Sequence, residues 1–364
     1  MDNKNNKRIN VLFVCAEIAK WKCQNLYDLM LADENFEPKI VVTIPFCKDF
    51  REKEYLDNCR FFEEKNIPYL QGYKPETNEF ISFKTFNPDV IFHQQPYALH
   101  ENQTPLHCAN KALSCYVPYF LPNQVSRLEY GYDFHSDVDK FYILDKNVKE
   151  YYSKMMKNQG KNLVVVGHPY LDYFQQKKMK KEKKYVIYAP HHSICDERTN
   201  FSTFLWSGKL ILEYAKKHPE INWIFKPHPY LRVTLKNYWN EWSKISKVVE
   251  TPDYLDLFEQ SYALITDCGS FLTEYFLTKQ PVIHLRREDS VPYNKTVTNI
   301  TDTYYKAYNA DELNELLEEV IIKRHDYKAD ERINLLKTLD FCNKNASLNI
   351  IKDLKKELNL NDKS

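Results

Sequence analysis

The stretch ALITDCGSFLTEY, residues 263–275, joins an apolar run of strand character to a segment of helical character through a short polar turn. Asp267 follows the apolar run directly, and Gly269 permits the chain to turn sharply. Two earlier stretches share this design, because YVIYAPHH (residues 185–192) and WIFKPHPY (residues 223–230) each follow an apolar run with histidine. In open parallel sheets, ligands bind at the carboxyl ends of strands. The three stretches therefore predict one binding site.

The rest of the chain repeats the same alternation of strand-like and helix-like segments. Strands are expected at residues 8–17, 38–45, 88–93, 114–122, 139–145, 162–169, 185–190, 221–227, 246–250, 262–267 and 281–285. Strands alternating with helices of about 10–15 residues are typical of βαβ units and a parallel sheet. We expect an α/β protein with two Rossmann-like domains facing a cleft and a C-terminal helical tail over residues 310–359.

A lysine-rich run at residues 177–184 separates the two ordered blocks. The predicted domains are an N-terminal one at residues 1–175 and a C-terminal one at 176–340, with a last helix in 341–364. The run itself is either a solvated linker or a basic patch attracted to anionic lipid.

Composition argues against several classes of protein. The 51 lysines and arginines nearly balance the 50 aspartates and glutamates, so no nucleic-acid partner is expected. The six glycines form neither a dinucleotide-binding fingerprint nor a P-loop. The nine cysteines occur singly, and neither a disulfide framework nor a zinc ribbon fits them. No stretch reaches the ~20 apolar residues of a membrane span, and no signal-peptide pattern is recognised, which predicts a cytoplasmic protein.

The loop TDCGS suits the binding of an anion. Thr266 and Asp267 end the strand, and Ser270 is expected to cap the following helix, whose N-terminal N–H groups attract phosphate. Glu274, one turn further on, can accept hydrogen bonds from sugar or base hydroxyls. Two plainer interpretations stay open: a simple capped turn, and a glutamate that only favours the helix dipole.

The segment FKPHP combines a cation with a constrained histidine. Pro227 and Pro229 each restrict the preceding residue to extended conformations, so His228 is expected in an extended loop beside Lys226. Lys226 can neutralise phosphate. His228, with an ordinary pKa of about 6.5, can act as general base or acid, or bond to a phosphate oxygen. Arg232 is either a further phosphate partner or a surface charge.

Other histidines complete the set of candidates. His191 and His192 follow Pro190, and neighbouring side chains of an extended chain point to opposite sides, so only one is expected to reach a ligand directly. Metal ligation is not expected, since no HxxxH or cysteine partner has a useful spacing. Weaker candidates in the first half, each alone more often structural or exposed than catalytic, are His93, His100, His107, Asn123, Arg127 and His135.

At these residues the chain resembles a known family. YAPHH, KPHP and ITDCGSFLTEYFLTKQPVIHL are similar to three signatures of the CDP-glycerol glycerophosphotransferase family, which includes teichoic-acid polymerases and their capsule-synthesis relatives. VGHPYLDYF, residues 166–174, resembles a stretch that precedes them, and the likeness covers residues 163–290. It implies a GT-B fold in which the N-terminal domain binds the acceptor and the C-terminal domain binds an activated CDP-alditol donor.

The resemblance also implies chemistry and site residues. It implies transfer of a phospho-alditol to a hydroxyl without a metal or cofactor. His228 corresponds to the family's second-domain histidine. Asp267, Gly269 and Ser270 fall in its donor-phosphate loop.

Two stretches depart from the family pattern. A Trp-His-Gly-Thr-Pro signature commonly carries the acceptor-side base, but the corresponding strand end here reads VPYFLPN. His93, one strand earlier, is the substitute candidate. His191, His192 and Ser193 stand where the family often has Thr-Trp-Arg.

We therefore expect a transferase that moves a phospho-alditol from a CDP-linked or other nucleotide-diphosphate donor to a hydroxyl of a cell-surface polysaccharide or lipid-linked acceptor. Lys226 and the helix beginning at Ser270 are expected to stabilise the growing charge. One alternative is a GT-B glycosyltransferase using a nucleotide sugar for capsule, lipopolysaccharide or glycan synthesis. Another is a non-catalytic binding partner of a capsule assembly complex. Peripheral contact with the inner face of the membrane is left open by the lysine run and the amphipathic tail at residues 346–360.

Overall fold

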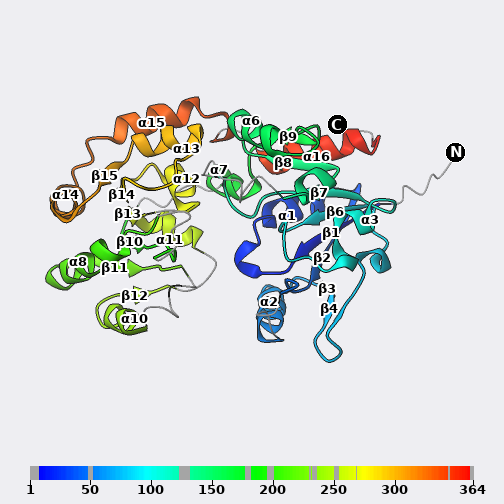
Figure 1. Cartoon of the computed structure of the whole chain (residues 1–364), viewed down its shortest axis with the longest axis horizontal. Helices are drawn as coiled ribbons and strands as arrows, with labels where there is room; N and C mark the ends of the chain where they lie inside the picture. Colours follow the sequence, from blue (N-terminus) through cyan, green and yellow to red (C-terminus); the bar gives the residue numbers. More distant parts are fainter. Residues whose placement is uncertain are drawn as a thin grey trace. The chain divides into compact units, whose positions relative to one another are not determined.

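The computed structural model describes residues 8–47, 52–122, 132–176, 182–194, 201–228, 231, 236–249, 254–267, 269–342 and 345–360. Within them the chain divides into two compact units (Figure 1). Unit 1 holds the described residues up to Leu121, residues 132–176 and residues 340–360. Unit 2 holds Pro122 and the described residues between 182 and 339.

Unit 1 is built on a parallel sheet with the strand order β3-β2-β1-β6-β7-β8-β9. Its strands are β1 (Ile9–Cys15), β2 (Phe36–Val42), β3 (Tyr69–Gln71), β6 (Val90–His93), β7 (Leu113–Tyr116), β8 (Lys140–Ile143) and β9 (Leu163–Val165), and a small antiparallel pair joins β4 (Tyr73–Lys74) to β5 (Glu79–Phe80). Strand β1 shows why this sheet forms. Phe13 and Cys15 pack into one apolar cluster, whereas Leu12 and Val14 pack into another. Successive side chains point to opposite faces, so both faces are buried, as is usual for a parallel sheet.

Helices and short helical turns cover the two faces of this sheet. They are η1 (Ile18–Lys20), α1 (Gln24–Ala32), α2 (Glu52–Glu64), η2 (Phe83–Phe86), η3 (Glu101–Gln103), α3 (Pro105–Cys108), α5 (Phe134–Asp137), α6 (Lys146–Met155), η4 (Pro169–Leu171), α7 (Asp172–Gln176), η7 (Asp340–Cys342) and α16 (Ala346–Glu357).

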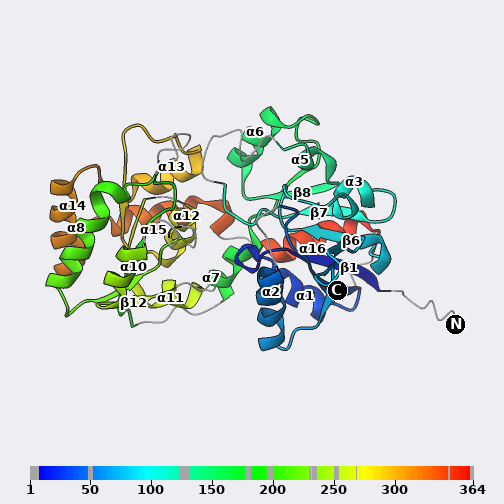
Figure 2. The same ribbon diagram turned by 60° about the horizontal axis from the view of Figure 1, so that its bottom comes forward.

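The C-terminal helix α16 belongs to unit 1, where it packs along α1 (Figure 2). The buried carboxylate of Asp172 accepts hydrogen bonds from the backbone N–H groups of Ala346 and Ser347, each at 2.8 Å, and thereby holds the start of the helix. Ile350 and Leu354 enter the core cluster of the sheet. The apolar face of this amphipathic tail, one of the two features that left membrane contact open, is therefore covered by unit 1.

Unit 2 is built on a second parallel sheet, in the order β12-β11-β10-β13-β14-β15. Its strands are β10 (Tyr185–Ala189), β11 (Asn222–Phe225), β12 (Lys247–Val248), β13 (Ser261–Thr266), β14 (Val282–Leu285) and β15 (Tyr305–Ala307). Its helical segments are α8 (Phe204–Lys217), α10 (Lys236–Ser243), α11 (Leu255–Gln260), α12 (Phe271–Glu274), η5 (Tyr275–Thr278), α13 (Lys295–Asp302), α14 (Ala310–Leu316), the π-helical η6 (Leu317–Ile322) and α15 (Ala329–Thr338). Val186, Tyr188 and Ile265 anchor its core, together with Trp242.

The predicted α/β class and parallel sheets are confirmed. The unexpected strands, β3, β4, β5 and β15, are two or three residues long and carry too little apolar pattern to be recognised. The helical tail expected over residues 310–359 is interrupted, because α14, η6, α15 and α16 are separate segments. Among the helices of the described ranges, none combines the length and apolar character that crossing a bilayer requires.

Candidate functional site

Three neighbouring strands of unit 2 end at one edge of its sheet. β10 pairs in parallel with β11 on one side and with β13 on the other. The polar residues that follow these strands are His191 and His192 after β10, Lys226 and His228 after β11, and Asp267 after β13. Because parallel strands end on the same side, the topology brings these residues to one place.

The rings of His191, His192 and His228 form one cluster. The ring centroid of His192 lies 4.1 Å from that of His228 and 4.3 Å from that of His191, and the remaining pair is 5.7 Å apart. The alternation of an extended chain predicts opposite directions for His191 and His192, and these ring contacts correct that expectation. Strand β10 ends at Ala189, so strand geometry does not govern the two residues.

Asp267 holds the histidine loop against the end of β13. Its carboxylate accepts hydrogen bonds from the backbone N–H of His191 at 2.8 Å and from that of Thr203, just before α8, at 3.0 Å. Burial raises the pKa of Asp267 to about 6, and the two N–H groups oppose this rise. The carboxylate thus connects three loops, which fixes the backbone that carries the histidines.

Lys226, Tyr254 and Glu274 form a second buried group at the same sheet edge. The Nζ of Lys226 lies 5.4 Å from the centroid of the Tyr254 ring, and the Tyr254 hydroxyl donates to Oε2 of Glu274 at 2.6 Å. Glu274 is therefore engaged by a protein side chain. Sequence reasoning misses Tyr254, since no motif surrounds it and its partner follows 20 residues later.

The turn after β13 differs from the capped helix predicted. Gly269 has a φ of +97°, a left-handed conformation that favours glycine. Ser270 stands at the N-cap position of α12, but its side chain makes no capping hydrogen bond, and α12 has only four residues before η5 begins. An α-helix of one turn offers a weaker dipole than a longer one. The hydroxyl of Thr266 donates to the carbonyl of Ala189 at 2.7 Å and supports the sheet edge.

Burial keeps His228 neutral. It is the main cause that lowers the pKa of His228 to about 3, and the charges of His192 and Lys226 lower it further. A neutral imidazole has one N–H donor and one acceptor nitrogen. The edge thus combines a buried ammonium group with imidazole N–H donors, which suits the oxygens of a phosphate. Within the described ranges, no three His, Cys, Asp or Glu side chains are placed to hold a metal ion.

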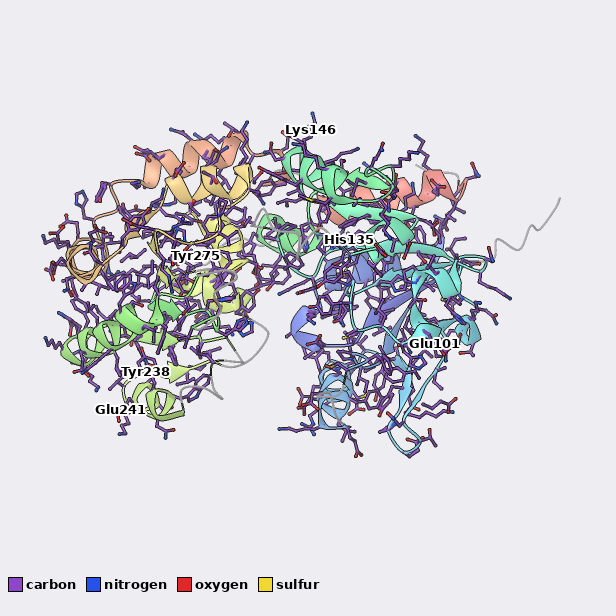
Figure 3. All side chains as sticks on the ribbon, in the orientation of Figure 1. Glu101, His135, Lys146, Tyr238, Glu241 and Tyr275 are labelled. Carbon is purple, nitrogen blue, oxygen red and sulfur yellow. The ribbon has the colours of Figure 1, made fainter. Side chains whose placement is uncertain are left out.

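Two of the histidines predicted in the first half are buried in unit 1. His93 ends β6, as expected, with 2% of its surface exposed, and its ring stands edge-on to Phe134 at 5.6 Å. Burial lowers the pKa of His93 to about 3. His135 is also buried and stacks on Phe141 at 4.9 Å (Figure 3). Neither ring can meet a large ligand without movement of the side chains packed around it.

The remaining predicted residues contribute locally or cannot be placed. The Nδ1 of His100 accepts a hydrogen bond from the N–H of Asn102, and Nε2 of His107 lies 3.0 Å from Oγ of Ser82. Three predicted residues fall outside the described ranges: Asn123, Arg127 and Arg232.

Comparison with protein families agrees with the motifs at this edge. The model of the family described as "CDP-Glycerol:Poly(glycerophosphate) glycerophosphotransferase" matches residues 128–355, which is more than half of the chain. The chain belongs to this family, as the three stretches that surround the histidine cluster indicate. No curated protein matches the sequence.

Solved structures share the fold along nearly the whole chain. S. aureus MnaA, in a co-structure with UDP, aligns with a TM-score of 0.64 and 13% identity over 98% of both chains. UDP-GlcNAc 2-epimerase from Neisseria meningitidis, bound to UDP-GlcNAc, aligns with a TM-score of 0.63 and 15% identity over 96% of this chain and 100% of that one. A variant of the Wall Teichoic Acid Polymerase TagF aligns with a TM-score of 0.58 and 14% identity over 96% of this chain and 90% of that one. These likenesses confirm the α/β fold of GT-B type.

Proposed function

We propose that this protein transfers a phospho-alditol, such as glycerol phosphate, from a CDP-linked donor to a hydroxyl of a cell-surface polysaccharide or lipid-linked acceptor. Membership of the glycerophosphotransferase family supports a transferase of this kind. The observation that carries the proposal is the edge of unit 2, where the rings of His191, His192 and His228 gather at the strand ends with Lys226. Its donors match the oxygens of a pyrophosphate.

In the proposed reaction, the acceptor oxygen attacks the β-phosphorus of the CDP-alditol. A new oxygen–phosphorus bond forms, and the bond from that phosphorus to the bridging oxygen breaks. CMP leaves with the bridging oxygen and its electron pair, and the acceptor proton passes to a base. Negative charge grows on the leaving oxygen, where Lys226 stabilises it. Preorganised charge of this kind is often the largest contribution to catalysis.

His228 takes the role of a hydrogen-bond donor to the pyrophosphate rather than of a proton source. With a pKa of about 3, its ring carries no extra proton at neutral pH. A bound anion raises the pKa of a nearby imidazole, so the donor itself strengthens this contact. The other residues assigned to the donor site are His191, His192, Lys226, Arg232, Thr266, Asp267, Gly269, Ser270 and Glu274.

Fewer residues are proposed for the acceptor side of the reaction than for the donor side. His93 is the base predicted from the sequence, and this role stays a prediction because the ring is only 2% exposed. It requires the packing against Phe134 to open, or a proton path through water. A lipid-linked acceptor would bring the protein to the inner face of the membrane as a peripheral partner.

The test is incubation of the purified protein with CDP-glycerol, CDP-ribitol and UDP-sugars, each with and without a glycan or lipid-linked acceptor. We expect acceptor-dependent release of CMP from one of the CDP-alditols. Release of UDP from a sugar donor, with no CMP from either alditol, identifies a glycosyltransferase instead. Absence of release with every donor, despite nucleotide binding, favours a non-catalytic binding partner.

A further inference from the structure

A second polar cluster lies at the carboxyl ends of three neighbouring strands, in unit 1. β6 pairs in parallel with β1 on one side and with β7 on the other. Glu17 and Lys20 follow β1, Gln95 and Tyr97 follow β6, and Tyr119 follows β7. We call these five residues the Lys20 cluster. Of the five, only Tyr119 lies in VPYFLPN, the stretch that stands in place of a family signature, and none is a site residue predicted from the sequence.

The ammonium group of Lys20 is the centre of this cluster. It is paired with the carboxylate of Glu17 and donates to Oε1 of Gln95 at 2.9 Å. It also lies 4.8 Å from the ring centroid of Tyr97 and 5.0 Å from that of Tyr119, whose hydroxyls are 2.7 Å apart. A cation placed over an aromatic ring is attracted by the negative charge of the ring face. The cluster therefore holds its polar atoms in one arrangement.

Neighbouring residues fix the loops that carry the cluster. Oε1 of the buried Gln94 accepts hydrogen bonds from the backbone N–H groups of Ala16 and Glu17, at 2.7 and 2.9 Å. Nε2 of the buried His168 donates to the carbonyl of Pro118 at 2.7 Å, which holds the loop after β7. The loop after β6 is thus tied to the loop after β1, the loop after β9 holds the loop after β7, and the contact between the two tyrosine hydroxyls of the cluster joins the loops after β6 and β7. These contacts form before any ligand arrives, as a binding site requires.

The chemistry of the cluster differs from that of the edge of unit 2. The charges of Lys20 and Glu17 cancel, so the cluster has no net charge to attract phosphate. It offers ammonium donors, carboxylate and amide acceptors, and phenol groups that do both, beside the partly exposed rings of Tyr97 and Tyr119. A neutral polyhydroxyl ligand fits this set, because each hydroxyl both donates and accepts while its C–H groups pack on the rings.

We propose that the Lys20 cluster binds the polyol or sugar that carries the acceptor hydroxyl. The assignment as an acceptor site rests on the proposed function, whereas binding of a polyol does not. Lys20 and Glu17 bind and orient the hydroxyls, and the tyrosine rings cover the carbon skeleton.

Saturation-transfer NMR on the full chain, with glycerol, ribitol and N-acetylglucosamine as probes, tests this binding. The variants are Tyr119→Phe, which removes one hydroxyl and keeps the ring, and Lys20→Met, which removes the charge. Matched controls are Tyr170→Phe and Lys22→Met, because the Nζ of Lys22 lies 3.9 Å from the ring centroid of Tyr170 in the same unit. We expect binding of at least one probe to weaken about fivefold or more in both cluster variants and in neither control.

Three results overturn the proposal: no probe binds the wild-type chain, the cluster variants bind the probes as the wild type does, or the control variants weaken binding as much as the cluster variants do. Should Lys20→Met fail to fold, Tyr119→Phe decides the question, since it retains every ring contact.

Two further measurements separate this inference from the proposed function: the acceptor KM for CMP release in Tyr119→Phe, and titration of the protein with CDP. If CMP is released normally and the acceptor KM of Tyr119→Phe equals that of the wild type, the cluster is not the acceptor site and the transferase proposal stands. If no CMP is released and CDP does not bind, the transferase proposal fails, while the probe experiment still decides whether the cluster binds polyols.

Discussion

The tetrapeptide HPYL begins three residues after a strand end in both units, as residues 168–171 after β9 and 228–231 after β11. In both copies the N–H of the leucine donates to the carbonyl of the histidine at 2.9 Å. The two histidines nevertheless have different partners. His168 is buried and binds the Pro118 carbonyl, whereas His228 joins the rings of His191 and His192.

The residue after each tetrapeptide extends the contrast. In unit 1 it is Asp172, which holds the N-terminus of α16, and in unit 2 it is Arg232, which we assign to the donor phosphate. The position of the strand explains the difference. β9 is the edge strand of its sheet, while β11 pairs with β10 beside the other polar loops. The same tetrapeptide, closed by the same hydrogen bond between leucine and histidine, thus supports the fold in unit 1 and belongs to the candidate site in unit 2.

The largest expected effect comes from His228→Ala. Loss of one preorganised donor to a transition state lowers kcat by about 10²–10³-fold, and we expect a loss of this size in CMP release from the CDP-alditol, together with weaker CDP binding. His218→Ala is the matched control in the same unit, because His218 follows α8 and pairs with Glu220 at the surface. An activity of His228→Ala within twofold of the control contradicts the proposed site.

His168→Ala should have the opposite effect to His228→Ala: it should lower stability and leave CDP binding unchanged. The change leaves the carbonyl of Pro118 and the N–H of Tyr170 without their partner and opens a cavity in unit 1. We expect the free energy of unfolding to fall by about 3 kcal/mol, measured by urea denaturation, with CDP affinity unchanged in the folded protein. A loss of CDP affinity as large as that of His228→Ala would remove the distinction between the two copies.

Much of the fold can be predicted from the sequence. Apolar runs such as residues 185–189 and 261–266 are long enough to show strand character, and the strand-end rule correctly places their polar ends at one edge. A strand of three residues such as β15 escapes this reasoning. So does the anchor of α16, because Asp172 precedes its partner Ala346 by 174 residues and no local pattern links them.

The candidate site could be predicted in part. Lys226 and His228 stand out because prolines flank the histidine, and Asp267 stands out as the end of a strand. The support of Asp267 by Thr203, across 64 residues, depends on tertiary structure. The two HPYL copies show the same limit, since identical residues and the same backbone bond give no information on which partners a histidine meets.

The stability of the wild type should depend on pH differently from that of Asp267→Asn, because only the wild type has a titrating carboxyl group at this position. Burial raises the pKa of Asp267 from 3.8 to about 6, so the folded protein binds its proton more tightly than the unfolded chain does. The resulting stability is fully present below about pH 4 and is lost as the pH rises through about 6. Relative to Asp267→Asn, we expect the wild type to lose about 2–3 kcal/mol of unfolding free energy over this interval. Parallel curves for the two proteins in urea denaturation would contradict the assigned burial.

The smallest effect, that of Gly269→Ala, tests whether the loop after β13 depends on backbone conformation alone. No described atom outside the neighbouring residues lies within 4 Å of a Cβ added at Gly269, so steric contact with the described part of the chain contributes nothing. The φ of +97° is strained for alanine, at a cost of about 1–2 kcal/mol. Asparagine tolerates left-handed conformations better, so Gly269→Asn should lose less stability than Gly269→Ala in the same denaturation series. If the larger asparagine is the more damaging of the two, the space around this turn, rather than its backbone conformation, limits the substitution.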